Sequence, residues 1–211
     1  MPSKNFSYPE TKMKNLIFAT NNAHKVAEIR SLLDENFTIL PLEEAGIFVD
    51  IPEPFNTLEE NAIGKAEFIY RLKGLDCFAE DTGLEVNALH GAPGVKSARY
   101  AGDERSFENN IDKLLDRLKG ETDRSARFKT VICLIVKGKH NIFEGVCKGT
   151  IIAEKRGNHG FGYDPVFIPD GAGKTFAEME LREKNVFSHR KKATEKLIQH
   201  LNKALVENTG L

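Results

Sequence analysis

The stretch FATNNAHKVAEIR, residues 18–30, carries side chains suited to hold an anion. Its apolar start predicts a strand, and the small polar residues that follow lead into an amphipathic helix. A helix N-terminus offers unpaired N–H groups and the positive end of the helix dipole, and Lys25 adds a full charge there. The stretch lacks the glycines of a P-loop. Its local features therefore leave two interpretations open: a phosphate site, and a polar turn in which asparagines cap the helix.

A pair of neighbouring carboxylates, Glu80 and Asp81, follows an apolar run in the segment AEDTGLEV. Catalytic and metal-binding groups of α/β proteins gather at the carboxyl ends of strands, and oxygen-only ligands favour Mg²⁺ over zinc. Because side chains alternate along a strand, we expect the two carboxylates to point apart. Glu53, in an acidic loop upstream, is a further candidate ligand. Taken alone, the pair fits a helix cap or a solvated turn equally well.

Two aromatic residues, Phe161 and Tyr163, lie between glycines in the segment GNHGFGYDPVF. Aromatic rings on a glycine-rich loop are suited to stack on a flat ligand such as a nucleobase. The equally weighted alternative is that the glycines let the chain turn while the aromatic rings fill the core. Asp164 and Pro165 by themselves are typical of a turn.

The segment EKNVFSHRKKA places two basic residues, His189 and Arg190, directly after a helix-capping residue, Ser188. Positive charges in a first helical turn oppose the helix dipole, and a local rule broken in this way is more expected at a functional site. The planar donors of Arg190 suit a purine O6/N7 edge or a phosphate. We expect the two lysines that follow to be solvated.

The elements that must position these side chains alternate between strands and helices at both ends of the chain, around a β-rich middle. We predict strands at residues 16–20, 37–42, 76–79, 84–89, 126–136, 141–152 and 166–168. We predict helices at residues 25–35, 57–74, 106–120 and 188–205, marked by capping signals or apolar stripes. This pattern indicates the α/β class with a central mixed sheet. The KGKH turn joins a long hairpin, which we expect to form a second lobe with a cleft between the lobes.

Composition and charge argue against several classes of protein. A chain of 211 residues with 40% hydrophobic residues supports one large domain or two lobes on a shared core. The formal net charge of −1 argues against a nucleic-acid binder, and no apolar run is long enough for a membrane span. Residues 1–13 lack the apolar block of a signal peptide, and we predict a flexible lead-in to a single domain, residues 14–211. The three cysteines have no zinc or disulfide spacing, which indicates reduced thiols in a cytoplasmic protein.

Five segments in this order, TNNAHK, EDTGL, GAPGVKSARYAG, GFGYDP and KNVFSHR, closely resemble the inosine triphosphate pyrophosphatase family. The resemblance runs from about Leu16 to Leu205. It implies an elongated α/β fold of two lobes around a central mixed sheet, and a homodimer. It also implies hydrolysis of the non-standard purine nucleoside triphosphates ITP, dITP and XTP to the monophosphate and pyrophosphate, which cleanses the nucleotide pool. The implied cofactor is Mg²⁺, with Mn²⁺ as the alternative.

The resemblance assigns roles motif by motif. The residues implied to hold the triphosphate are Thr20, Asn21, Asn22, Ala23, His24, Lys25 and Lys65. The implied general base and metal ligand is Asp81, with Glu53 as its partner and Glu80 as an additional ligand. The residues implied to contact the substrate and its base are Thr82, Phe161, Gly162, Tyr163, Asp164, Lys184, His189 and Arg190.

The first motif departs from the family pattern T-G-N-x-x-K, because Asn21 replaces the glycine and His24 precedes the lysine. Asparagine tolerates left-handed backbone conformations, so we expect the turn to survive. At the base, Arg190 would donate to the carbonyl oxygen at position six of hypoxanthine or xanthine and would face the amino donor of adenine.

Three rival interpretations stay open. The closest is a pyrophosphatase of modified pyrimidine or other nucleotides, against which the SHR and FGYD segments argue. The second is a nucleotide-binding regulator without turnover. The third is a nucleic-acid binder whose basic face would consist of Arg99, Arg105, Arg124 and Arg127.

Overall fold

The computed structural model describes residues 14–33 and 37–209. The predicted lead-in, residues 1–13, and the end of the first predicted helix, residues 34–35, lie outside these ranges. A seven-stranded sheet organises the described residues, with the order β2-β1-β3-β5-β6-β7 and the short β4 beside β3. The strands are β1 (Lys14–Phe18), β2 (Phe37–Pro41), β3 (Cys77–Val86), β4 (Pro93–Gly94), β5 (Ser125–Val136), β6 (Lys139–Ile151) and β7 (Phe167–Pro169). Because β1 is parallel to β2 and β3 while the other pairs are antiparallel, the predicted mixed sheet is confirmed.

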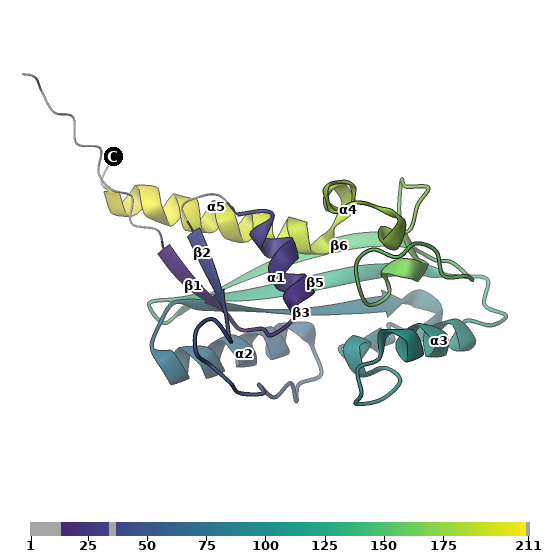
Figure 1. Cartoon of the computed structure of the whole chain (residues 1–211), viewed down its shortest axis with the longest axis horizontal. Helices are drawn as coiled ribbons and strands as arrows, with labels where there is room; N and C mark the ends of the chain where they lie inside the picture. The colour runs from purple at the N-terminus through teal and green to yellow at the C-terminus, as the bar shows by residue number, and fades with distance from the viewer. Residues whose placement is uncertain (1–13, 34–36, 210–211) are drawn as a thin grey trace, which may run out of the picture.

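Helices cover both faces of this sheet (Figure 1). They are α1 (Ala23–Arg30), α2 (Leu58–Lys73), α3 (Phe107–Arg117), α4 (Leu181–Phe187) and α5 (His189–Thr209). One apolar core lies between α2 and residues such as Ala79 and Val131, and a second lies between α1, α5 and residues such as Phe78 and Ile132. Neighbouring residues of one strand thus serve opposite faces, as the pleat requires. A third core surrounds α3 at the other end of the sheet.

The helix ends follow the signals in the sequence. Thr57 caps α2 by accepting a hydrogen bond from Glu60 N, and Gly74 ends that helix in a left-handed conformation. Ser106 caps α3, and Ser188 Oγ accepts a hydrogen bond from Lys191 N in the first turn of α5. These predicted caps are confirmed. Helix α4 was not predicted; it has seven residues, and the residue before it, Glu180, makes no capping hydrogen bond.

Strand β3 is continuous, which corrects the prediction of two shorter strands with Glu80 and Asp81 at the end of the first. Every residue of β3 pairs with β5, from Cys77 opposite Ile135 to Val86 opposite Ala126. Thr82 and Gly83 suggested that a strand ends before them. They stay in the strand because they pair with Thr130 and Lys129 of β5. The two carboxylates therefore lie in mid-strand.

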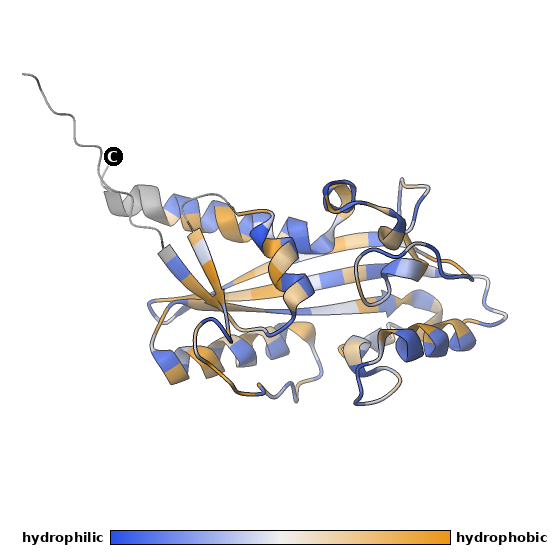
Figure 2. Ribbon diagram, viewed as in Figure 1, coloured by the Kyte–Doolittle hydropathy of each residue, from blue (hydrophilic) through white to orange (hydrophobic). Residues whose placement is uncertain are grey.

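The hairpin of β5 and β6 turns at Lys137 and Gly138, whose φ angles are 49° and 77°, as a tight hairpin turn requires. The predicted turn is confirmed, but the hairpin does not form a separate lobe. Phe128 belongs to the core around α3, whereas Val131 and Ile135 belong to the core under α2. Figure 2 shows hydrophilic residues partway along β5, between these two apolar stretches. We call the regions around α3 and around α1, α2 and α5 the two lobes, and β3, β5 and β6 run through both.

One glycine fixes how closely α5 approaches the sheet. A Cβ atom at Gly145 of β6 would lie 2.0 Å from the carbonyl oxygen of His189 and 2.6 Å from the nitrogen of Ala193. The first turn of α5 therefore rests directly on the backbone of β6. This contact sets the position of the SHR segment relative to the strands.

All three cysteines of the chain lie in its interior. Cys77, Cys133 and Cys147 are buried free thiols, and burial raises the pKa of the first two to about 12. No helix within residues 14–33 and 37–209 combines the length and the apolar character needed to cross a membrane.

Candidate active site

A pocket of about 430 Å³ opens where the two lobes meet. It receives side chains from the loop before α1, from α2 and β3, from the glycine-rich loop after β6, and from α4 and α5. The predicted site residues that line it are Thr20, Asn21, Asn22, Lys25, Glu53, Lys65, Asp81, Thr82, Phe161, Gly162, Tyr163, Asp164, Lys184, His189 and Arg190. Ala23, His24 and Glu80 do not line it. The fold thus gathers residues that are far apart in the sequence into one cavity.

The loop before α1 meets the pocket with its helix N-terminus. Asn22 is the N-cap, and its Oδ1 accepts hydrogen bonds from the backbone nitrogens of His24 and Lys25, at 3.0 and 3.2 Å. The asparagine cap that the sequence left as an alternative is therefore present. Asn21 does not use a left-handed conformation, since the non-glycine residues with positive φ in the described ranges are elsewhere. Lys25 and the positive end of α1 still face the cavity.

Two of the predicted acidic ligands converge on one ammonium group. Lys65 Nζ lies 2.5 Å from Glu53 Oε1 and 3.3 Å from Asp81 Oδ1. Arg99 adds a second positive charge, 3.1 Å from Glu53 Oε2. Burial raises the pKa of Asp81 above its usual range. Burial acts in the same direction on Glu53, but Lys65, Lys25 and Arg99 outweigh it and lower the pKa of Glu53 to about 2.

Glu80 points away from Asp81, as the alternation along a strand predicts, and is bound inside a buried ion network. Its Oε2 accepts from Arg190 Nε at 2.8 Å, and its Oε1 accepts from Arg190 Nη2 at 3.0 Å and pairs with Lys25 Nζ at 3.0 Å. These cations hold the pKa of Glu80 below its usual range, although burial opposes them. Both carboxylate oxygens of Glu80 are therefore already paired with cationic side chains.

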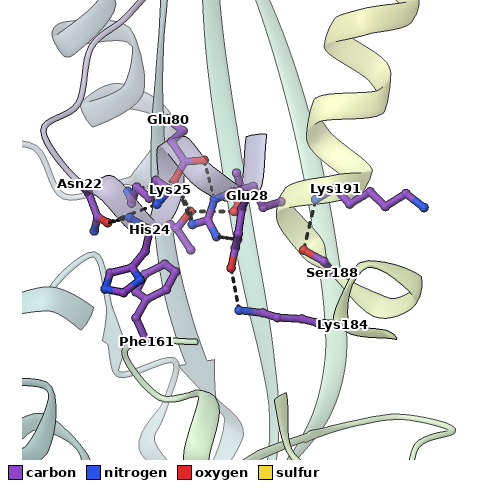
Figure 3. Close-up of polar contacts among 12 residues, drawn as sticks. Asn22, His24, Lys25, Glu28, Glu80, Phe161, Lys184, Ser188 and Lys191 are labelled. Atoms are coloured by element: carbon purple, nitrogen blue, oxygen red, sulfur yellow. Dashed lines mark hydrogen bonds and ion pairs between the residues drawn. The ribbon is translucent and has the colours of Figure 1, made fainter. Parts of the chain in front are cut away.

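Glu28 of α1 completes this network. It was not predicted as a site residue from the sequence. Its carboxylate is buried, accepts from Lys184 Nζ at 2.7 Å and pairs with Arg190 Nη1 (Figure 3). Burial would raise the pKa of Glu28, but Arg190 and Lys184 lower it to about 2. The available signal was a carboxylate beside Val26 and Ile29 on the apolar face of the helix. Only the fold shows that two distant cations meet it there.

The glycine-rich loop divides its two aromatic residues between the two predicted roles. Tyr163 is buried in the core, where its hydroxyl donates to the carbonyl oxygen of Ser97 at 2.9 Å. Phe161 is half-buried and lines the pocket. Its backbone nitrogen donates to Asp164 Oδ2 at 2.9 Å, and that oxygen also accepts from Lys184 Nζ at 2.6 Å. Phe161 is therefore the ring available for stacking.

His189 is held as a neutral imidazole. It is buried and stacks on Phe128, with ring centroids 4.7 Å apart and planes 11° apart. Burial and the neighbouring charge of Arg190 lower the pKa of His189 well below 6.5. Its Nδ1 is buried and has no hydrogen-bond partner among the described residues. A neutral ring at the pocket wall can meet an uncharged purine edge.

The arginines of the rival nucleic-acid interpretation do not form one basic face. Arg99 pairs with Glu53 and Arg127 with Glu85. Arg124 donates to the carbonyl oxygens of Leu118 and Ile151. Only Arg105 of this group lines the pocket, a position that the sequence did not indicate. Arg99, Arg124 and Arg127 therefore each meet separate local partners.

Comparison with known proteins identifies the family of this chain. The model of the Ham1 family matches residues 16–200. The dITP/XTP pyrophosphatase of Christiangramia forsetii is 53% identical over 188 residues, which cover 89% of this chain and 99% of that protein. The dITP/XTP pyrophosphatase of Flavobacterium psychrophilum is 54% identical over 183 residues, 87% of this chain and 96% of that protein.

Solved structures agree as well. The Staphylococcus aureus Ham1 protein superposes with a TM-score of 0.83 at 37% identity, over 90% of this chain and all of that one. A HAM1 protein from Coxiella burnetii gives the same TM-score at 40% identity, over 90% of this chain and all of that one. The family resemblance seen in the sequence is therefore confirmed, and the chain belongs to the Ham1 family of nucleoside triphosphate pyrophosphatases, hydrolases that act on phosphoric anhydrides.

Proposed function

We propose that this protein is a Mg²⁺-dependent pyrophosphohydrolase that converts ITP, dITP and XTP to the monophosphate and pyrophosphate, and so cleanses the nucleotide pool. The observation that carries this proposal is the convergence of Glu53 and Asp81 on Lys65 Nζ, at 2.5 and 3.3 Å, in a pocket that the N-terminus of α1 also reaches. The relatives named dITP/XTP pyrophosphatase support the class of substrate.

Asp81 and Glu53 are the residues that would hold the metal. Their oxygens already surround one positive charge, the ammonium of Lys65. Mg²⁺ is commonly held by one or two carboxylates, with substrate phosphates completing its shell, so this pair fits it. When bound, Mg²⁺ would neutralise phosphate charge and polarise the phosphoric anhydride; Mn²⁺ is the alternative ion.

The protein's own groups would then carry out the proton transfer and offset charge. Asp81 would accept a proton from a water molecule whose oxygen attacks the α-phosphorus, while the bond from that phosphorus to the bridging oxygen breaks and pyrophosphate leaves. Burial, which raises the pKa of Asp81, makes it a stronger base than an exposed aspartate. Lys25, at the N-terminus of α1, would offset the negative charge of the phosphates.

Arg190 supports the preference for a six-carbonyl base. It donates to Glu80 through Nε and Nη2, to Thr82 through Nη2 and to Glu28 through Nη1. A guanidinium has five N–H donors, so these four bonds leave one N–H, on Nη1, without a partner among the described residues. That group would donate to the O6 of hypoxanthine or xanthine and would face a donor in adenine.

The test is pyrophosphate release from ITP, XTP, GTP and ATP, with Mg²⁺ and after chelation. We expect strong release from ITP and XTP, little from ATP or GTP, and loss of activity with chelator that added Mg²⁺ restores. Equal turnover of ITP and ATP would contradict the role of Arg190, whereas GTP carries the same O6 and differs from ITP by its 2-amino group. Nucleotide binding without any release would favour the regulator without turnover.

The family resemblance also supports a homodimer that acts on small nucleotides. The net charge of −1, the lack of a long apolar run and the spacing of the cysteines support a cytoplasmic protein that binds neither nucleic acid nor membrane. Sedimentation equilibrium of the full chain would test the oligomeric state, with twice the mass of the 23.6 kDa chain expected. A single-chain mass across micromolar concentrations would contradict it.

A further inference from the structure

His24 lies beside the pocket without lining it. It follows the cap Asn22 in the first turn of α1, and its ring stacks on Phe161 with centroids 5.1 Å apart and planes 17° apart. Figure 3 shows the two rings next to each other. Asn22 and Lys25 line the pocket and so does Phe161, whereas the imidazole between them in sequence does not. The imidazole therefore packs on Phe161 from outside the cavity.

The cationic neighbours of Phe161 lie on the pocket side. Lys184 Nζ and Arg190 Cζ are 5.4 and 5.5 Å from the centroid of the ring, and both residues line the cavity. A third aromatic ring, Phe107 at the start of α3, is 6.1 Å away and tilted by 48°. Phe161 is thus surrounded by groups from α1, α3, α4 and α5.

The backbone around Phe161 does not hold the ring by itself. The main chain is anchored, since Phe161 N donates to Asp164 Oδ2 at 2.9 Å and a Cβ at Gly160 would lie 2.0 Å from that oxygen. These contacts fix the backbone but not the side-chain torsions of Phe161, so the orientation of the ring depends on its side-chain neighbours. His24 supplies the near-parallel contact, and it comes from α1, which packs in the core of the other lobe.

We propose that His24 is a positioning residue for the substrate base: it braces Phe161 from outside the pocket and holds the ring where a purine stacks. This proposal rests on the proposed function, in which Phe161 is the stacking ring. It assigns His24 a role through Phe161, in place of the phosphate contact that the TNNAHK motif suggested. An aromatic pair of this kind contributes enough to change an equilibrium about 2- to 10-fold.

The first experiment compares His24→Ala and His24→Phe with the natural chain in the hydrolysis of ITP. We expect His24→Ala to raise KM about 2- to 10-fold with kcat nearly unchanged, and His24→Phe to restore KM because a ring replaces a ring. An imidazole that binds phosphate predicts the same loss in both variants. That result, or no change in His24→Ala, would overturn the proposal.

Two controls make the comparison specific. His200→Ala removes a similar contact, since the rings of His200 and Phe143 lie 5.5 Å apart with planes at 56° and neither residue lines the pocket, and we expect no change in KM. In a Phe161→Ala background, His24→Ala should cause no further increase in KM, because the ring that His24 contacts is then missing. An unchanged effect of His24→Ala in that background would overturn the proposal.

A second readout does not depend on turnover. Hydrogen exchange of the segment 157–163 should be faster in His24→Ala and near normal in His24→Phe. Unchanged exchange would overturn the brace even in an active enzyme. Faster exchange in a protein that releases no pyrophosphate would instead contradict the proposed function and leave the brace supported.

Discussion

Asp81 and Glu53 share the ammonium of Lys65, and this sharing sets what each residue can do. Lys65 offsets the charges of the buried Asp81 and the half-buried Glu53, which would otherwise repel each other. Burial still raises the pKa of Asp81, whereas Glu53 stays ionised. Two acids of one site therefore have different tendencies to hold a proton, which suits one to act as base and the other as a permanent ligand.

Asp81→Asn tests the role of the base. We expect turnover of ITP to fall at least ~100-fold, because an amide cannot take the proton from the attacking water. The measurement is kcat from pyrophosphate release at saturating Mg²⁺. Asp103→Asn, in an exposed loop before α3, is the matched control and should keep normal turnover. Near-normal turnover in Asp81→Asn would contradict its assignment as the base.

Many residues of the candidate site could be predicted from the sequence alone. TNNAHK, EDTGL, FGYD and SHR contain twelve of the predicted residues that line the pocket, because these side chains meet the cavity from fixed positions in short motifs. Glu28 and Arg99 were not predicted as site residues. Each contributes by meeting a charge from a distant segment, Lys184 in one case and Glu53 in the other. Such pairings depend on tertiary structure and leave no local pattern.

At the scale of elements, the Glu28 carboxylate ties α1 to α4 and α5 through Lys184 and Arg190. Removing one partner of a buried ion pair leaves the others uncompensated. We expect Glu28→Gln to lower the free energy of unfolding by roughly 3 kcal/mol at pH 7, measured by urea denaturation. Glu44→Gln, which breaks the exposed pair with Arg30, should change it by less than about 1 kcal/mol.

The same variant has a predictable pH dependence. The pKa of Glu28 is lowered to about 2 in the folded chain from an ordinary 4.5. Its stabilising contribution is therefore complete above about pH 4.5 and is lost as the pH falls toward 2. The difference in stability between the natural chain and Glu28→Gln should shrink over that range. A difference that stays constant would show that the loss comes from packing rather than from charge.

Gly145 controls the contact between α5 and β6. Gly145→Ala would place a methyl group 2.0 Å from the carbonyl oxygen of His189, so the first turn of α5 must move away from the sheet. We expect a loss of about 1–3 kcal/mol in stability and a raised KM for ITP, because His189 and Arg190 move with that turn. Gly173→Ala is the control, since a Cβ there meets nothing within 4 Å. Unchanged KM in Gly145→Ala would show that α5 tolerates the shift.

Helices and strands could be predicted where the sequence carries strong local signals such as caps. They were missed where contacts with a distant strand determine the structure. The caps at Thr57 and Ser106 identify α2 and α3 from a few residues. Thr82 and Gly83 suggested a break in β3, but pairing with β5 carries the strand through them. Helix α4 has neither length nor a side-chain cap, so its sequence resembles a loop.

At the scale of the whole molecule, the pocket takes residues from both lobes, so a ligand that binds there should stabilise the entire chain. We expect IMP, the product of ITP hydrolysis, to raise Tm. At one hundred times its Kd, the ligand adds about 2.7 kcal/mol to the free energy of unfolding. AMP at the same concentration should raise Tm much less, since Arg190 faces a donor in adenine. The measurement is thermal unfolding followed by two probes, which should coincide in one transition. Equal shifts with both nucleotides would contradict base discrimination in the pocket.

Because β3, β5 and β6 pass through both lobes, continuous paired strands, rather than a flexible linker, cross the boundary between the lobes in the described part of the chain. Rotating one lobe against the other would bend three paired strands at once and strain their hydrogen-bond ladders. The dimensions of the cavity are therefore largely set before a nucleotide binds. The entropy lost on binding then comes from ordering loops and side chains rather than from moving one lobe against the other. The shared strands therefore act as a rigid support for the pocket, and exchange of substrate and product with solvent depends on the loops and side chains at the rim of the pocket.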